Sequence, residues 1–280
     1  MKIDAHQHFW KLDRGDYGWL TPDLDLLYRD FLPDDLKPIL DGSGIDGTVL
    51  VQAADSDAET DFMLDLAATH DWILGVVGWV SLSSDTAIDR LTILSRNRKF
   101  CGVRPMLQDI AQTDWVLDPA NHAALTCLSN NDVAFDALIQ PRHFAVIDTL
   151  AARYPELKIV IDHGAKPDIA NHMWDDWKAG LDQLALHENC FCKLSGLATE
   201  TSPQQTLTDT ARYGMHVLET FGPHRTIWGS DWPVCTLRTS IDEWKKLCER
   251  LVGPLSIAER DAVFGDTATM VYGVGRALSD

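Results

Sequence analysis

The sequence has few positive charges and no apolar run long enough to cross a membrane. The apolar stretch Ile73–Val80 is far shorter than the roughly 20 residues that a membrane-spanning helix needs. Lysine and arginine number 24 against 42 aspartate and glutamate residues, a formal net charge of -18. Nucleic acids and anionic membrane surfaces bind clusters of cationic side chains, so this balance argues against both as partners.

Motifs for secretion, disulfide bonding and serine catalysis are also absent. The chain opens on a strand-like pattern instead of a charged segment followed by an apolar one, so we expect no secretory signal and a cytoplasmic protein. Its six cysteines form no Cys-x-x-Cys pair and are spread along the chain, which predicts reduced, mostly buried thiols. No Gly-x-Ser-x-Gly motif occurs, which argues against a serine hydrolase with a nucleophile elbow.

Short apolar segments alternate with helical segments along the whole chain. The expected strands are 1–8, 47–52, 73–80, 100–104, 133–138, 158–163, 190–195 and 226–231. The expected helices are 33–44, 57–70, 86–97, 121–130, 142–153, 168–187, 204–221, 241–251 and one opened by the capping box Ser256-x-x-Glu259.

This alternation predicts the fold class. Strands that alternate with helices form right-handed βαβ units with a parallel sheet, and eight such units close into a (β/α)8 TIM barrel. A chain of 280 residues with 45% hydrophobic and 24% charged residues suits one globular domain, so we expect a single α/β barrel over residues 1–280. Active sites in this fold lie at the carboxyl ends of the strands.

The first expected strand carries two histidines. Side chains alternate faces along a strand, so Asp4, His6 and His8 point to the same side and direct two imidazoles at one point. Imidazole is the commonest metal ligand and titrates near neutral pH. The pair is therefore a candidate metal or acid–base site, and a structural role for each ring is the alternative.

Polar side chains also stand at the ends of the other apolar strands, where burial is costly unless they bind something. These candidates are Gln52, Arg104, Asp162, His163, Lys193, Ser195, Ser230, Asp231 and Trp232. Structural alternatives stay open for several of them. Asp231 is also a suitable helix N-cap, His163 a hydrogen-bond donor, Arg104 and Lys193 ion-pair partners of carboxylates, and Trp232 a core residue. The other seven histidines are expected in surface or packing positions.

Four motifs at four strand ends carry a resemblance to a known family. They are Asp-x-His-x-His-Phe-Trp at 4–10, Asp-His-Gly-x-Lys-Pro at 162–167, Lys-Leu-Ser-Gly at 193–196 and Gly-Ser-Asp-Trp-Pro at 229–233. In this order they resemble the amidohydrolase superfamily, and within it the sugar-lactonase branch of L-fuconolactonase-like and L-rhamnonolactonase-like hydrolases. The resemblance implies a distorted TIM barrel, which agrees with the alternation of strands and helices.

The resemblance also implies a metal-ligand set. Superfamily members that hold a metal use the two histidines of the first strand, histidines after the fifth and sixth strands and the aspartate of the eighth. The matching residues here are His6, His8, His163 and Asp231, whereas the fifth strand carries no histidine at its tip and no bridging lysine follows the fourth. This set argues against a binuclear site and leaves one divalent ion, zinc, or a metal-independent site.

By the same resemblance, the activity is hydrolysis of a sugar (aldono) lactone to the aldonic acid, which is a carboxylic ester hydrolase reaction. Lactone opening needs a base for the attacking water, donors for the oxyanion and a proton for the ring oxygen. We expect Asp231 as base and then acid, with His6, His8 and His163 polarising the carbonyl. The other expected substrate contacts are Arg104, Trp10, Gln52, Lys193 and Trp232.

Two alternative functions stay open. One is a metal-dependent decarboxylase or an amide or ester hydrolase of the same superfamily. The other is a non-catalytic sugar- or metal-binding barrel, against which the acid–base residue Asp231 argues. The expected partner is a small sugar lactone, and a homo-oligomer is left open.

Overall fold

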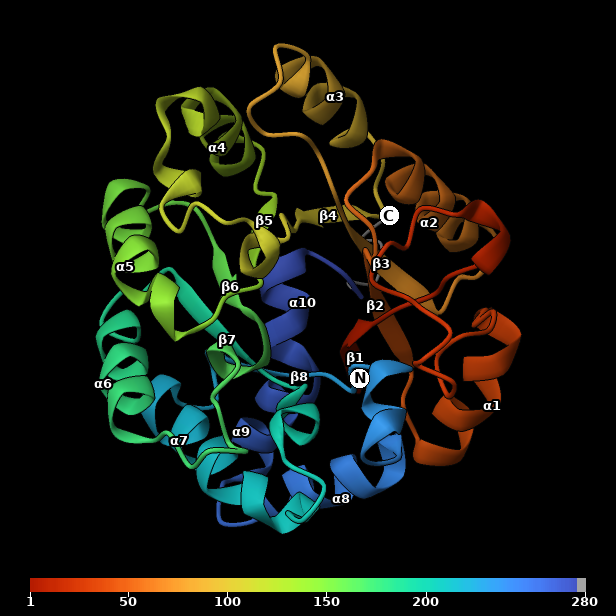
Figure 1. Cartoon of the computed structure of the whole chain (residues 1–280), viewed down its shortest axis with the longest axis vertical. Helices are drawn as coiled ribbons and strands as arrows, with labels where there is room; N and C mark the ends of the chain where they lie inside the picture. The colour runs from red at the N-terminus through yellow and green to blue at the C-terminus, as the bar shows by residue number, and fades with distance from the viewer. Residues whose placement is uncertain (276–280) are drawn as a thin grey trace.

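A computed structural model of the chain describes residues 1–275, and its centre is a barrel of eight parallel strands (Figure 1). The strands are β1 (Ile3–Gln7), β2 (Gly47–Val51), β3 (Ile73–Gly78), β4 (Phe100–Val103), β5 (Ala134–Ala137), β6 (Ile159–Ile161), β7 (Cys190–Leu194) and β8 (Thr226–Trp228). They follow one another around the sheet in chain order, which is the expected order of a TIM barrel. The predicted fold class is thus confirmed.

The seam between β8 and β1 closes through the segments that carry candidate site residues. The backbone N–H of His8 donates to the Trp232 carbonyl at 2.7 Å, and that of Asp231 donates to the His6 carbonyl at 2.8 Å. Close approach at this point requires Gly229, because a Cβ there would lie 2.7 Å from the Cβ of His6. Closure of the barrel therefore brings the strand-1 histidines beside Asp231.

Helices surround the barrel, and the last of them covers the end where the strands begin. They are α1 (Pro33–Ser43), α2 (Asp57–Thr69), α3 (Ala87–Leu94), α4 (His122–Asn130), α5 (Phe144–Arg153), α6 (Asp175–Leu184), α7 (Ala211–Phe221), α8 (Ile241–Leu251), α9 (Ile257–Asp261) and α10 (Thr267–Tyr272). Ser256 caps α9 through the predicted capping box with Glu259. In the described part of the chain, no helix is both long and apolar enough to cross a bilayer.

Two expected helices begin later than the sequence indicates. The expected helix 168–187 is α6 alone, because Asp168 accepts a hydrogen bond from the Asn171 backbone at 3.1 Å and His172 is left-handed, with φ of 57°. Such local bonds compete with helix formation. The expected helix 204–221 starts with a single 3-10 turn, Leu207–Thr210, capped by Thr206 and Asp209, before α7.

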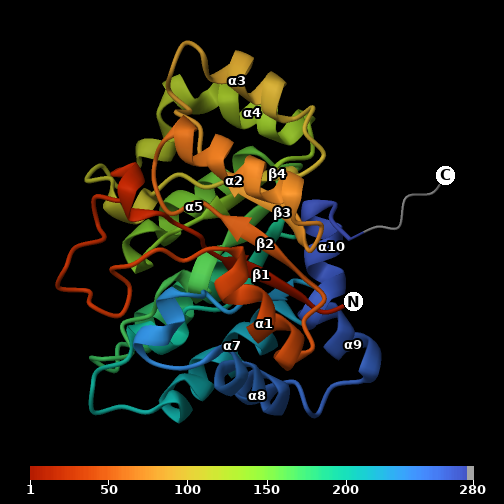
Figure 2. The same ribbon diagram turned by 90° about the vertical axis from the view of Figure 1, so that its right-hand side faces the viewer.

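The barrel interior is filled from the end where its strands begin. Small and β-branched side chains of the strands pack there against Ala268, Val271 and Tyr272 of α10. Figures 1 and 2 show α10 across this end, while the long loop before α1 lies at the opposite end. All six cysteines are free and five are buried, as predicted. The end of the barrel that remains accessible is the carboxyl end of the strands.

The loop between β1 and α1 is fastened to the barrel by Glu59 of α2. The buried Glu59 carboxylate accepts from Tyr17 at 2.8 Å and from the Ala53 backbone at 3.0 Å, and it pairs with Arg14 at 3.2 Å. The same loop carries Trp19, whose indole N–H donates to the Ala53 carbonyl at 2.8 Å. Glu59 thus holds both the loop that carries Trp19 and the Ala53 backbone that accepts the hydrogen bond from Trp19.

Glu59→Gln should remove a pH-dependent part of the stability. Burial raises the pKa of Glu59 from 4.5 to about 7. Between these values the folded protein retains a proton that the unfolded chain releases, so this contribution is complete below pH 4.5 and declines as the pH rises to 7, by about 2–3 kcal/mol. Urea unfolding at pH 4.5, 6 and 7.5 should show a flatter profile for Glu59→Gln than for wild type. The exposed control Glu156→Gln should follow wild type, and parallel profiles for all three proteins would contradict this role of Glu59.

Candidate active site

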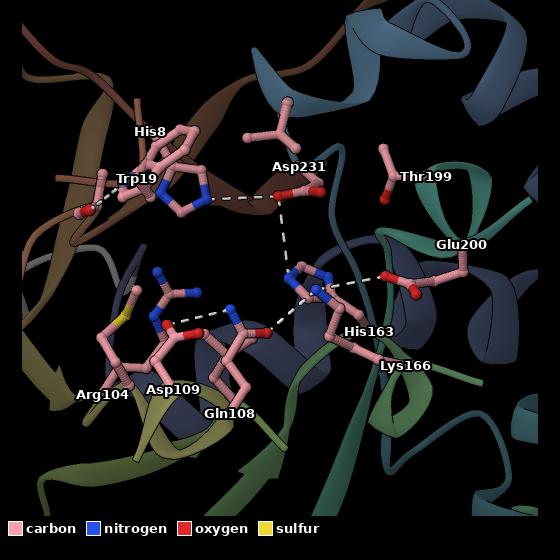
Figure 3. Close-up of a pocket in the computed structure, with 14 residues that line it drawn as sticks. His8, Trp19, Arg104, Gln108, Asp109, His163, Lys166, Thr199, Glu200 and Asp231 are labelled. Carbon is pink, nitrogen blue, oxygen red and sulfur yellow. Dashed lines mark hydrogen bonds and ion pairs between the residues drawn. The ribbon is translucent and has the colours of Figure 1, made fainter. Parts of the chain in front are cut away.

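A cavity of about 270 Å³ opens at the carboxyl ends of the strands (Figure 3). It is lined by His8, Trp19, Ala53, Arg104, Met106, Gln108, Asp109, Leu138, His163, Lys166, Thr199, Glu200, Asp231 and Val234. These side chains follow seven different strands, which is the arrangement of active sites in TIM barrels. The cavity suits a single small ring, at the lower end of the roughly 300–1,000 Å³ of ligand pockets.

Asp231 stands at the base of the cavity with three imidazoles around its carboxylate. Its Oδ1 lies 3.4 Å from Nε2 of His8, 3.8 Å from Nε2 of His6 and 3.9 Å from Nε2 of His163. The Asp231 backbone is left-handed, with φ of 61°, and Ser240, not Asp231, caps α8. A strained backbone at a buried carboxylate is a common feature of functional sites.

Burial opposes ionisation of Asp231, but the surrounding imidazoles of His163, His8 and His6 hold its pKa well below the usual range. The carboxylate is therefore ionised at neutral pH, ready to accept a proton.

The protonation of His8 follows from its backbone contact. Nδ1 of His8 lies 2.7 Å from the Val51 carbonyl oxygen, which only accepts, so Nδ1 carries the proton. In the neutral ring, Nε2 then presents its lone pair to the space beside Asp231. This carbonyl-bound arrangement is also the one that usually orients a metal-binding histidine.

His163 is directed into the cavity by an unusual turn after β6. Residues His163, Gly164, Ala165 and Lys166 all have positive φ, at 54°, 58°, 62° and 50°. Three of them are not glycine, and each costs about 1–2 kcal/mol in this conformation. Nδ1 of His163 bonds Ser195 Oγ at 2.9 Å, and Gly196 leaves room for the ring because a Cβ there would lie 2.3 Å from Nδ1.

His6 lies behind Asp231 between two cations. Its Nδ1 is 3.0 Å from Nζ of Lys193 and 3.4 Å from Oδ1 of Asp162, while its Nε2 is 3.4 Å from Nη1 of Arg104. Burial, together with the charge of Lys193, holds the pKa of His6 well below its ordinary value, so the ring is neutral. Both cations only donate and a neutral ring has one acceptor nitrogen, so His6 accepts either from Lys193 at Nδ1 or from Arg104 at Nε2, and the Lys193 contact is the shorter.

A buried network of charges supports these rings. Lys193 is fully buried and pairs with Asp136 at 2.5 Å and with Asp162 at 3.0 Å, and Tyr272 of α10 donates to Asp136 at 2.9 Å. Arg104 pairs with Asp162 at 3.3 Å. Burial works against both charges, yet the carboxylates raise the pKa of Lys193, and Lys193 holds that of Asp162 well below its usual range. Lys193 is thus ionised inside the barrel.

The donor atoms also fit one metal ion. Ligand atoms of His6, His163 and Asp231 lie within 4.8 Å of one another, and Nε2 of His8 faces the same carboxylate. Imidazole nitrogens with one carboxylate oxygen form a common zinc ligand set. His6 joins this set only when its proton sits on Nδ1 and donates to Asp162 at 3.4 Å. At the end of β5, Asp136 pairs with Lys193, so the residues favour one ion over two.

The structure places the predicted site residues in two groups. His8, His163, Arg104 and Asp231 line the cavity, and His6 lies directly behind them. Lys193 pairs with carboxylates, and Gln52 Nε2 donates to the Arg104 carbonyl at 2.7 Å, so both lie behind the lining.

The two predicted tryptophans lie away from the cavity. Trp10 is fully buried against Tyr17, Trp19 and Phe31, and Trp232 packs on Phe9 and Phe31. Neither belongs to the lining, and the aromatic side chain that does is Trp19, 38% exposed. The other seven histidines lie outside the lining, as expected.

Sequence reasoning missed six polar or aromatic lining residues: Trp19, Gln108, Asp109, Lys166, Thr199 and Glu200. Lys166 stood in the Asp-His-Gly-x-Lys-Pro motif and was open to detection. The other five lie on loops or short 3-10 turns, and the sequence carries no pattern that marks them.

The chain belongs to the amidohydrolase family, whose profile matches residues 3–274. Among its relatives is an L-fucono-1,5-lactonase of Burkholderia ambifaria, 42% identical over all of this chain and 98% of the relative. An L-fucono-1,5-lactonase of Burkholderia multivorans is 37% identical over 97% of this chain and 96% of its own length. A crystal structure of a Burkholderia multivorans amidohydrolase with bound zinc is 36% identical, with a TM-score of 0.92, over 98% of this chain and 100% of that one.

Lys193→Met should be strongly destabilising. The change leaves Asp136 and Asp162 buried without their cation, and loss of one partner from a buried ion pair costs about 3–5 kcal/mol. Guanidinium unfolding monitored by tryptophan fluorescence measures the loss. Lys246→Met is the matched control, because Lys246 pairs with Asp242 on the surface and should change the stability little. Equal losses for the two variants would contradict a central role for Lys193.

Proposed function

We propose that this protein is a carboxylic ester hydrolase that opens the ring of a sugar lactone, with L-fucono-1,5-lactone as the first substrate to test. The observation that carries the proposal is the ionised, buried carboxylate of Asp231, ringed by three imidazoles in a cavity the size of one sugar ring. The full-length similarity to two L-fucono-1,5-lactonases supports this substrate class. We also propose that residues 1–280 form a single domain.

Asp231 acts on the attacking water. One carboxylate oxygen takes a proton from water as the water oxygen bonds the lactone carbonyl carbon, and the carbonyl becomes a tetrahedral oxyanion. Collapse of this intermediate breaks the bond to the ring oxygen, which receives the same proton from Asp231. The products are an open-chain hydroxyl and a carboxylic acid, and the aspartate is regenerated.

Arg104 is the group suited to the oxyanion. It is 3% exposed, fixed by Asp162 at 3.3 Å and by the Gln52 carbonyl, and it lines the cavity. A preorganised charged donor of this kind stabilises the transition state more than the ground state. In this proposal Gln52 and Lys193 are positioning residues that act through Arg104 and His6.

Asp231→Asn should lower kcat for L-fucono-1,5-lactone by at least about 100-fold, because the amide cannot accept the proton from water. The measurement is acid release followed with a pH indicator, after subtraction of spontaneous opening. Asp55→Asn, on an exposed aspartate outside the cavity lining, is the matched control and should keep wild-type turnover. An Asp231→Asn protein with near-normal kcat would contradict the assignment of the base.

We also propose that His6, His8, His163 and Asp231 would hold a single zinc ion when one is bound. Such an ion would supply positive charge that polarises the lactone carbonyl. The chain also has two cations of its own beside His6. Nζ of Lys193 lies 3.0 Å from Nδ1 of His6, and Nη1 of Arg104 lies 3.4 Å from its Nε2. Nδ1 of His6 lies closer to Nζ of Lys193 than to Oδ1 of Asp162, which favours the form with the proton on Nε2. In that form Nε2 cannot bind a metal ion.

Turnover should therefore survive removal of metal. Protein treated with a chelator and verified by elemental analysis should keep most of its kcat/KM on L-fucono-1,5-lactone, because Asp231 and Arg104 carry the reaction. A loss of about tenfold or more that zinc restores would contradict this prediction. A strict zinc requirement, without acid release from any lactone, would instead favour the metal-dependent decarboxylase or amide hydrolase of the same superfamily.

The cytoplasmic location and a homo-oligomeric state stay predictions from the sequence. The last five residues of the expected domain, 276–280, lie outside the described residues.

A further inference from the structure

One wall of the cavity carries three polar side chains that the lactone reaction does not use. Gln108, Lys166 and Glu200 come from the loops after β4, β6 and β7. Lys166 lies between the other two, with Nζ 3.1 Å from Oε1 of Gln108 and 3.4 Å from Oε1 of Glu200 (Figure 3). The three side chains, which we call the polar wall, therefore form one connected group.

Lys166, the central residue of the polar wall, belongs to the same strained turn as His163. Lys166 is the fourth residue of the left-handed segment that begins at His163, so one backbone conformation directs both side chains into the cavity. The side chains of Lys166 and Glu200 are 25% and 21% exposed, so the pair is partly shielded from water. Partial burial makes the charge of either residue matter to a ligand more than it would on the surface.

Charge neutralisation is the main effect of the polar wall. The cavity lining holds two cations, and each has a carboxylate partner: Arg104 pairs with Asp162, and Lys166 pairs with Glu200. Asp231 and Asp109 add two further acids to the lining. Counted without its histidines, the lining therefore carries a net negative formal charge, which favours an uncharged ligand over an anion.

We propose that Glu200 is a specificity-determining residue that neutralises Lys166, so that the cavity accepts uncharged sugar lactones, rejects lactones bearing a carboxylate and releases its anionic product. This inference rests on the proposed lactone hydrolysis. The reaction turns a neutral ring into an aldonate, and the paired lysine then offers the new carboxylate no free cation. The polar wall presents both donors and acceptors, which suits the hydroxyl groups of a sugar.

Glu200→Gln tests the proposal, because it keeps the side-chain shape and frees the charge of Lys166. The probes are L-fucono-1,5-lactone, which is neutral, D-glucaro-1,4-lactone, which carries a carboxylate, and the product L-fuconate. The ratio of kcat/KM for the glucaro-lactone to that for the fucono-lactone should rise about tenfold, the effect of one charge-assisted hydrogen bond. L-Fuconate should inhibit the variant at about tenfold lower concentration, through the same contact.

Two further variants separate charge pairing from other effects. Lys166→Met combined with Glu200→Gln has no free cation and should lose both gains. Asp55→Asn removes an exposed acid outside the cavity lining without freeing Lys166, so both readouts should change less than about threefold. Glu200→Ser frees Lys166 in the same way and replaces Glu200→Gln if that protein does not fold.

An unchanged ratio and unchanged fuconate inhibition in Glu200→Gln would overturn the proposal, as would equal gains in the double variant. Failure of the proposed function gives a different result, because wild type would then not accelerate opening of the neutral lactone. In that case, binding of L-fuconate still tests the role of Glu200. Calorimetric titration with L-fuconate requires no turnover and should still show tighter binding to Glu200→Gln than to wild type.

Discussion

The charge of Lys193, held inside the barrel, is the constraint on which the arrangement of the site depends. Its ammonium group bonds Asp136, Asp162 and His6, which come from three other strands. Buried charges are costly unless they are paired with good geometry, so these strands must meet at one distance and in one register. The network fixes the ring of His6 and, through Asp162, the guanidinium of Arg104. The network thereby holds His6 with its Nε2 3.8 Å from Oδ1 of Asp231.

This network divides the site into a rigid part and a variable part. Asp231, His6, His8 and Arg104 lie on or directly after strands, and ion pairs and backbone contacts fix them from behind. The polar wall and Trp19 lie on loops and short turns at the cavity mouth. Chemistry on strands and selectivity on loops is the usual division of labour in TIM barrels. In the proposed reaction, the same base would thus serve different lactones when the loops change.

The fold was predictable because its signals are local. Eight apolar segments with helical segments between them define the barrel, and the polar residues at their ends, His6, His8, His163 and Asp231, could be named as one site. Trp10 and Trp232 were predicted to contact the substrate, but both pack in the core. Their position in the sequence did not distinguish the two outcomes, because a tryptophan near a catalytic residue in sequence packs equally well into a core. Gln108 and Glu200 could not be found, because their positions depend on how three loops fold over one another. Loop residues lack the periodicity that marks strands and helices.

The central claim is that this cavity opens sugar lactones with the chain's own base. The most direct measurement is acid release by the purified, metal-analysed wild-type protein from a panel of fucono-, galactono-, rhamnono- and arabinonolactones, each compared with its spontaneous opening. We expect acid release in proportion to enzyme concentration from at least one of these neutral lactones, with and without chelator. Opening of all four at the spontaneous rate, by protein that is folded and monodisperse, would contradict it.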